Sequence, residues 1–288
     1  MPQLPASAPS LTRRLPTALL LGCAITLAGC TSHSVQAEPT RMAPTTQAEQ
    51  NGSFEHWLAD FQRRALAQGV DPDILQQATR ELTPDPAVIR ADQHQPEFSR
   101  PVWEYLDGAV SAIRVNSGQR LLDEHADLLA AIEQRFGVDR HILVAIWGLE
   151  SNFGGNMGSR KIVRSLATLA HEGRRPEFAE TQLLAALEIL QRGDVAVDAM
   201  VGSWAGAMGQ TQFIPTTYNS HAVDFDGNGK RDIWGSEADA LASAANYLRA
   251  SNWQSGQPWG FEIRLPNDFD YASADLNHRQ SLAHWREL

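Results

Sequence analysis

A single glutamate, Glu150, ends a strongly apolar segment and is the side chain best placed to carry out chemistry. Segment 142–149 holds only apolar residues and glycine, and Asp139 precedes it as a helix N-cap. This pattern predicts a helix that is apolar on nearly all sides, lies in the core and has Glu150 as its last residue. Segment 151–155 contains glycines that break the helix, which would leave Glu150 at the rim of a cleft.

Partial burial at such a rim would disfavour the charged carboxylate and raise the pKa of Glu150. A raised pKa is what a general acid needs near neutral pH. The alternative is a glutamate that only accepts hydrogen bonds from loop amides. A carboxylate that ends a purely apolar helix is costly unless it has a partner or a task, so the residues around Glu150 decide between the two interpretations.

A second motif at 202–218 reads Gly-Ser-Trp-Ala-Gly-Ala-Met-Gly-Gln-Thr-Gln-Phe-Ile-Pro-Thr-Thr-Tyr. Its glycines and small residues allow close backbone approach, while Gln210, Gln212, Ser203 and Tyr218 offer hydrogen bonds or a stacking face. That mixture suits a sugar, which presents hydroxyls at its edges and C–H groups on its faces. The alternative is a glycine-rich structural turn with core aromatics, but such a turn does not require two glutamines.

Segment 148–154 followed by the 202–218 motif resembles the membrane-bound lytic murein transglycosylase B family. The resemblance runs from about residue 54 to the end of the sequence, and it implies a mainly α, lysozyme-like helical core with a small irregular or β-containing part. It identifies Glu150 as the catalytic acid/base. It also implies glycan-binding roles for Ser203, Gln212 and Tyr247, and for the basic pair Arg174 and Arg175 near the cleft.

The resemblance further implies how one carboxylate suffices, although most glycosidases use two. Glu150 would protonate the glycosidic oxygen of the MurNAc–GlcNAc β-1,4 bond and then deprotonate the muramic acid 6-hydroxyl, which closes a 1,6-anhydro ring. Two alternatives remain open. One is a hydrolytic muramidase on the same fold, and the other is a non-catalytic peptidoglycan-binding lipoprotein.

The acidic segment 224–234 matches an EF-hand loop in its alternating oxygen ligands and its central glycine, and it predicts a structural Ca²⁺. Gly235 stands where the usual late glutamate would be, so either Glu237 or Asp239 could supply the last ligand, and the resemblance favours Asp239. No cofactor is expected for catalysis. The alternative is an Asx-rich turn without metal. The predicted ligands are Asp224, Asp226, Asn228, the carbonyl of Lys230, and Asp239.

The N-terminus predicts export and lipidation. Arg13 and Arg14 precede a short apolar run that ends in Leu-Ala-Gly-Cys, which looks like a bacterial lipobox with Cys30 as the lipidated residue. We therefore expect a signal peptide at 1–30, a flexible tether at 31–53 and an outer-membrane lipoprotein that faces the periplasm. The alternative is an ordinary signal peptide in which Cys30 is incidental.

Composition and residue patterns limit the possible partners and predict the remaining helices. The net charge of −10 without a basic stripe argues against nucleic-acid binding, and we expect a monomer that binds peptidoglycan strands. We predict helices at 54–68, 72–79, 101–117, 118–136, 176–191 and 237–250, an extended or irregular Pro-rich passage at 83–101, and strand-like and loop sequence after Trp259. The family continues past the point where this sequence ends, so we expect a catalytic domain at 54–288 that is short at its C-terminus.

Overall fold

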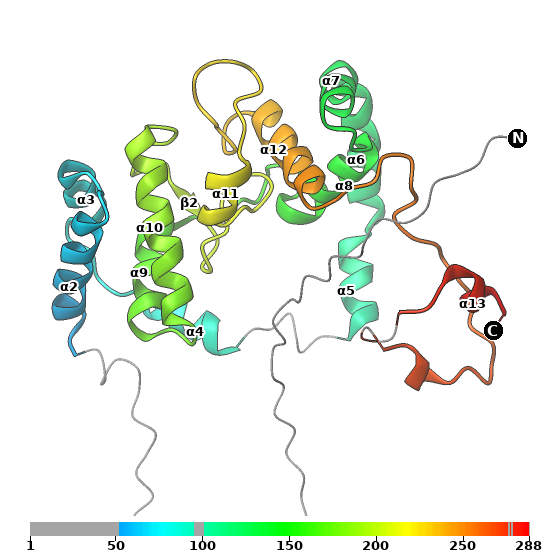
Figure 1. Ribbon diagram of the computed structural model, residues 1–288, viewed down its shortest axis with the longest axis horizontal. Coiled ribbons are helices and arrows are strands. Elements are labelled where there is room, and N and C mark those ends of the chain that lie inside the picture. The colour runs from blue at the N-terminus through cyan, green and yellow to red at the C-terminus, as the bar shows by residue number, and fades with distance from the viewer. Residues whose placement is uncertain (1–51, 95–100, 276, 278, 288) are drawn as a thin grey trace, which may run out of the picture. The chain divides into compact units, whose positions relative to one another are not determined.

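The computed structural model describes residues 52–94, 101–275, 277 and 279–287 (Figure 1). The described residues are mainly helical, as predicted, and their only sheet has two strands. The predicted signal peptide, Cys30 and nearly all of the tether lie outside the described residues. Among the helices described, none combines the length and hydropathy needed to cross a membrane.

The first helices after residue 52 are α2 (Phe54–Ala67), α3 (Pro72–Thr79) and α4 (Pro86–His94). The Asp71 carboxylate accepts hydrogen bonds from the amides of Asp73 and Ile74, which confirms the predicted cap of α3. Helix α4 corrects the prediction of an irregular passage at 83–101. The Asp85 side chain accepts from the Ala87 amide, so Asp-Pro begins α4 in the same way as it begins α3.

Four helices follow, namely α5 (Val102–Ala109), α6 (Ala112–Glu124), α7 (Ala126–Phe136) and α8 (Arg140–Ser151). The first three replace the two long helices predicted over 101–136. The first break is at Ser111, whose hydroxyl accepts from the Arg114 amide and caps α6. The second break is at His125, which ends α6 and precedes α7. Side chains that cap locally can interrupt an otherwise continuous helical pattern.

Helices α9 (Ile162–Glu172) and α10 (Pro176–Arg192) pack side by side (Figure 1). Helix α9 has no counterpart among the predicted helices. The two helices form one hydrophobic core with α2, α3 and α4. A second core joins α6, α7 and α8 to α12 (Glu237–Ala250), which Ser236 caps as predicted.

The remaining elements are short. Strands β1 (Arg160–Lys161) and β2 (Val201–Gly202) pair antiparallel, and α11 (Pro215–His221) follows the second motif. After Trp259 the described residues contain no strand, which corrects the strand-like prediction; they form a 3₁₀ turn, η2 (Tyr271–Ser273), and a final helix, α13 (Leu282–Glu287).

Helix α8 differs from its prediction in one respect that matters for function. Leu143 and Trp147 are buried, but Leu149 is 52% exposed, so one face of the helix lies at the surface. The helix also continues one residue past Glu150. The apolar residues of α8 therefore form both part of the core and an exposed face of the helix, and Glu150 lies on the exposed face.

Candidate active site

Glu150 opens onto a pocket of about 290 Å³ between the end of α8, the second motif and α12. Within the described part of the chain, Glu150 is the only acidic residue of the pocket wall. The other lining residues are Ile146, Thr211, Gln212, Phe213, Ile214, Thr217, Ala244, Tyr247 and Leu248. A pocket with mostly apolar walls and a few polar groups is the usual form of a ligand site.

The last turn of α8 determines where Glu150 points. Asn152, Phe153 and Gly154 all have positive φ angles, of 51°, 59° and 80°, so the chain reverses directly after the helix. The glycine is required, because a Cβ at position 154 would lie 2.8 Å from Oε1 of Gln210. The reversal leaves Glu150 at the mouth of the pocket, as the sequence predicts.

The environment of Glu150 favours its protonated form. Burial of the carboxyl by the pocket walls raises its pKa above the ordinary value of 4.5, even though the residue as a whole stays exposed. No hydrogen-bond or ion-pair partner compensates for this loss of hydration among the described residues. The alternative of a glutamate held by loop amides therefore does not fit this geometry.

Gln212 faces the pocket from the second motif. Its φ is 51°, and its side-chain amide donates to the carbonyls of Gly209, at 2.9 Å, and Met157, at 3.2 Å. Both side-chain bonds of Gln212 use its nitrogen, and within the described part of the chain its amide oxygen accepts no hydrogen bond. That oxygen is available to accept a hydrogen bond from a hydroxyl-rich ligand.

Tyr247 forms the facing wall from α12. Its ring meets Phe213 and His221 edge-on, with ring centroids 5.8 Å and 5.3 Å apart, and the residue stays 41% exposed. Exposed aromatic faces suit stacking on sugar rings. The structure therefore brings together three residues that the sequence predicts, namely Glu150, Gln212 and Tyr247.

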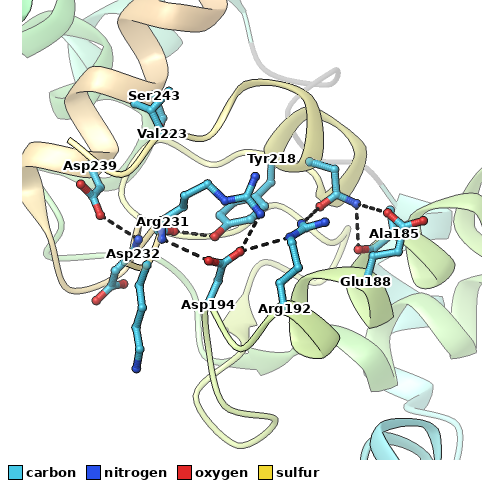
Figure 2. Close-up of polar contacts among 12 residues, drawn as sticks. Ala185, Glu188, Arg192, Asp194, Tyr218, Val223, Arg231, Asp232, Asp239 and Ser243 are labelled. Atoms are coloured by element: carbon cyan, nitrogen blue, oxygen red, sulfur yellow. Dashed lines mark hydrogen bonds and ion pairs between the residues drawn. The ribbon is translucent and has the colours of Figure 1, made fainter. Parts of the chain in front are cut away.

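Two predicted glycan contacts need correction. Gln210 is 5% exposed and Tyr218 is fully buried, so neither has surface to offer a sugar. The Tyr218 hydroxyl donates to the Arg231 carbonyl at 2.5 Å, and burial together with the nearby Asp194 charge raises its pKa. Figure 2 shows Tyr218 in this polar network, where Asp194 also accepts from the Arg231 side chain.

Ser203, Arg174 and Arg175 do not line the pocket of Glu150. The Ser203 hydroxyl accepts from the Ala207 amide at 3.0 Å and so stabilises the start of the second motif. The two arginines border a different pocket of about 160 Å³. Arg174 bonds to Asp92, and the guanidinium of Arg175 lies over the Phe178 ring.

The individual residues of the apolar pocket wall were not predicted, although helical spacing could have indicated some of them. Ile146 lies one turn before Glu150 on α8, and Ala244 lies three residues before Tyr247 on α12. Residues three or four apart on a helix share a face. Thr217 and Ile214 carry no comparable signal in the sequence.

The acidic loop brings three carboxylates together. Oxygens of Asp224, Asp226 and Asp239 lie within 4.8 Å of one another. Asp239 is fully buried, and its pKa is raised above the ordinary value. Burial and the charge of Asp226 raise the pKa by more than hydrogen bonds from three backbone amides lower it. Closely placed carboxylates of which one is buried fit a hard cation with oxygen ligands. Glu237 does not belong to this carboxylate cluster, because its Oε2 instead lies 3.3 Å from Nε2 of His125.

The other two predicted ligands lie in the same loop. The Asn228 side-chain oxygen accepts a hydrogen bond from the Lys230 amide at 2.9 Å. The backbone amide of Asn228 donates to the carboxylates of both Asp224 and Asp226. In this arrangement the loop amides use some of the carboxylate oxygens. The loop is therefore folded around the carboxylates, with the turn held in place at Gly227, whose φ is 77°.

The fold and the site together define a class, a lysozyme-like helical domain with one candidate acid in its pocket. The chain belongs to the Transglycosylase SLT domain family, which matches residues 53–288. The family was expected from the two motifs and is confirmed.

Individual relatives agree with this assignment. Membrane-bound lytic murein transglycosylase B of Escherichia coli (strain K12) is 29% identical over 307 residues, which cover 93% of this chain and 84% of the relative. The crystal structure of SltB3 from Pseudomonas aeruginosa in complex with NAG-NAM-pentapeptide is 60% identical, with a TM-score of 0.78 over 82% of this chain.

A third relative is the Escherichia coli lytic transglycosylase Slt35 in complex with calcium. It is 30% identical, with a TM-score of 0.64 over 70% of this chain and 64% of that one. The present chain spans 63% of the SltB3 chain, which is less than two thirds of its length.

Proposed function

We propose that this protein is a lytic transglycosylase that cleaves the MurNAc–GlcNAc β-1,4 bond of peptidoglycan, with Glu150 as its only acid/base. The observation that carries the proposal is that Glu150 is the one carboxylate that the described residues place in the pocket, with its pKa raised by burial. A second carboxylate would be needed to form a glycosyl-enzyme or to activate water. The family membership supports the same chemistry.

The reaction needs no external nucleophile. Glu150 gives its proton to the glycosidic oxygen as the bond to C1 of muramic acid breaks. The carboxylate then accepts the proton of the muramic acid 6-hydroxyl while O6 bonds to C1, so the proton and the bond count are both restored. The apolar wall formed by Ile146, Phe213 and Leu248 disfavours water near C1, which would otherwise give hydrolysis.

Gln212 and Tyr247 would hold the glycan in this pocket. The free amide oxygen of Gln212 can accept from a sugar hydroxyl or N-acetyl N–H, and Tyr247 offers a ring face. Arg174 and Arg175 border a separate pocket with Trp204. We keep them as contacts to a longer substrate, together with Ser203 at the start of the motif.

The test is mass spectrometry of the soluble products released from purified peptidoglycan by residues 31–288. Glu150→Gln removes the acid, and its turnover is expected to fall by at least about 10²- to 10⁴-fold. Glu124→Gln is the matched control, because Glu124 is on the surface of α6 and pairs only with Arg120.

Each outcome identifies one function. Anhydromuropeptides from the parent and from Glu124→Gln, with none from Glu150→Gln, support the transglycosylase. Reducing-end products would identify a hydrolytic muramidase. Peptidoglycan binding that survives in Glu150→Gln, without turnover in the parent, would identify a non-catalytic binding protein.

We also propose that the acidic loop binds a structural Ca²⁺ through Asp224, Asp226 and Asp239, with Asn228 and the Lys230 carbonyl completing the set. The convergence of the three carboxylates supports this, and so does the calcium complex of the related Slt35. The ion would relieve the repulsion between the carboxylates and join the loop to α12. It has no part in the proton transfers of Glu150.

The calcium proposal is tested by thermal unfolding with Ca²⁺ or with chelator. Calcium at 100-fold over its Kd stabilises a protein by about 2.7 kcal/mol, which corresponds to a rise in Tm of about 5 to 10 °C for a domain of this size. Asp226→Asn should lose most of this rise, whereas the exposed Asp123→Asn control should keep it. A Tm that does not respond to Ca²⁺ would contradict the proposal.

Finally, we propose that the protein is an outer-membrane lipoprotein that faces the periplasm, anchored by a lipid on Cys30. The lipobox pattern supports this, as does the name of the Escherichia coli relative, a membrane-bound enzyme. Cys30→Ala should abolish incorporation of labelled fatty acid, and Cys23→Ala is the matched control in the same segment. Equal labelling of both variants would contradict the proposal.

A further inference from the structure

Gln210 belongs to the second motif, yet it faces away from the pocket and into the protein. It is 5% exposed, and all of its polar atoms have partners. Its Oε1 accepts from the Trp147 indole at 2.9 Å, and its Nε2 donates to the Trp234 carbonyl at 3.2 Å. Its backbone amide donates to the Ile233 carbonyl at 2.9 Å, and its carbonyl accepts from the Ser151 hydroxyl at 2.6 Å.

These partners fix the orientation of the Gln210 side-chain amide. An indole N–H can only donate and a backbone carbonyl can only accept, so exchanging the oxygen and nitrogen of Gln210 would break both bonds. A buried polar side chain with all of its bonds made stabilises one arrangement of the elements around it. Gln210 therefore determines a single relation between α8 and segment 233–234.

Two of the partners flank Glu150. Trp147 lies three residues before it and Ser151 directly after it, on the last turn of α8. Ser151 connects the turn further, because its hydroxyl oxygen accepts from the Gly154 amide at 2.8 Å while it donates to Gln210. The bonds to Gln210 thus prevent the last turn from rotating or unwinding where Glu150 enters the pocket.

The other two partners, Ile233 and Trp234, end the acidic segment. The same segment is joined to α12 by Asp239, whose carboxylate accepts from the Asp232 amide at 2.9 Å. Gln210 is also only two residues from Gln212, which lines the pocket. Gln210 therefore connects the last turn of α8, the second motif and the end of the acidic loop.

We propose that Gln210 is a positioning residue that holds Glu150 at its working distance from Gln212 in the pocket and joins the last turn of α8 to the end of the acidic loop. This proposal rests on the proposed function, and it concerns the placement of the acid rather than the binding of glycan. Catalytic groups must be held within about 0.5 Å of their productive geometry. A displacement of about 1 Å can lower the rate by about 10²-fold.

The test compares Gln210→Met with Thr168→Val. Both variants keep most of the side-chain volume and remove buried hydrogen bonds. The Thr168 hydroxyl accepts from the Asp85 amide and donates to Arg164, and it contacts neither α8 nor the pocket. With the full chain and soluble glycan, Gln210→Met is expected to lower kcat by about 10- to 100-fold with little change in KM. Thr168→Val is expected to lower Tm while kcat stays at the parent value.

A second variant covers the case in which Gln210→Met fails to fold. Trp147→Phe keeps an aromatic ring but removes the indole donor to Gln210, and it should lower kcat in the same way. In the double variant the two losses should not add, because both remove the same bond. Additive losses would overturn the proposal. So would an unchanged kcat in Gln210→Met, or an equal fall in Thr168→Val.

A parent without turnover would overturn the proposed function, and the positioning role is then decided by NMR titration of the Glu150 carboxyl. A Gln210→Met variant in which Glu150 titrates at a different pH from the parent, while Thr168→Val matches the parent, supports positioning. Identical titration of Glu150 in all three proteins overturns it.

Discussion

Two tyrosines of this protein make a matched experiment, because Tyr218 and Tyr247 were both expected to contact the glycan and the structure separates them. Tyr218 is buried below the second motif, where Figure 2 shows it beside Arg231 and Asp194. Tyr247 faces the pocket of Glu150. Replacing each tyrosine with phenylalanine removes one hydroxyl and keeps the ring.

The cost at Tyr218 follows from the hydrogen bond that its hydroxyl donates to the Arg231 carbonyl. That carbonyl also accepts from the Ile233 amide at 3.2 Å, so it keeps a partner when the hydroxyl is removed. The loss is therefore that of one ordinary hydrogen bond, about 0.5 to 1.5 kcal/mol, rather than the larger cost of an unpaired buried group. For a domain of this size, 1 kcal/mol corresponds to a fall in Tm of about 2 to 4 °C.

Tyr247→Phe should behave in the opposite way. No hydrogen bond of the Tyr247 hydroxyl is recorded among the described residues, so its removal should change stability by less than about 0.5 kcal/mol, as for most surface positions. A hydroxyl that bonds the glycan would instead lower kcat/KM by about 2- to 10-fold when removed. Thermal unfolding and glycan turnover are measured on both variants. A Tyr218→Phe protein with unchanged Tm and weakened turnover would refute the assignment of Tyr218 to the core.

Three further predictions concern pH and packing. Because Glu150 must be protonated to act as an acid and its pKa is raised, turnover should fall as the pH rises through that pKa, and the fall should be seen in a pH profile of kcat/KM. For Asp194, burial raises the pKa but hydrogen bonds to Arg231 lower it further, below 3.8. A lowered folded-state pKa stabilises the fold at pH values above it, so Asp194→Asn should destabilise the protein at neutral pH. In urea unfolding, the difference in unfolding free energy between parent and variant should shrink as the pH falls through the folded-state pKa. Gly202→Ala would place a Cβ 2.0 Å from the carbonyl oxygen of Ala207 and should lower the free energy of unfolding by at least about 1 to 3 kcal/mol. In the control Gly260→Ala the new Cβ meets no atom within 4 Å, so urea unfolding should show no comparable loss.

Local signals in the sequence predicted the elements that they control directly. Asp71 and Ser236 cap α3 and α12 as expected, because a cap depends on residues within one turn. Helix α4 was missed because a Pro-rich composition concealed a second Asp-Pro start at Asp85. The division of 101–136 into three helices was missed because periodicity does not reveal a cap such as Ser111 inside an apolar pattern.

The sequence by itself identified Glu150 as the candidate acid. Glu150 follows an apolar helix and precedes residues that must reverse the chain, and both facts can be read from neighbouring positions. The acidic loop is local in the same sense, since Asp224 and Asp226 come together around one glycine turn.

Only the tertiary structure decided which polar residues face the pocket. Gln210 and Gln212 are two positions apart in the same motif and chemically identical, yet the first is buried against α8 and the second lines the pocket. Tyr218 on α11 and Tyr247 on α12 also differ, since the first is fully buried and the second is 41% exposed. Direction in an irregular segment depends on backbone angles such as the φ of 51° at Gln212, and on partners from distant helices. Neither can be read from residue type, because no regular period relates position to face outside helices and strands.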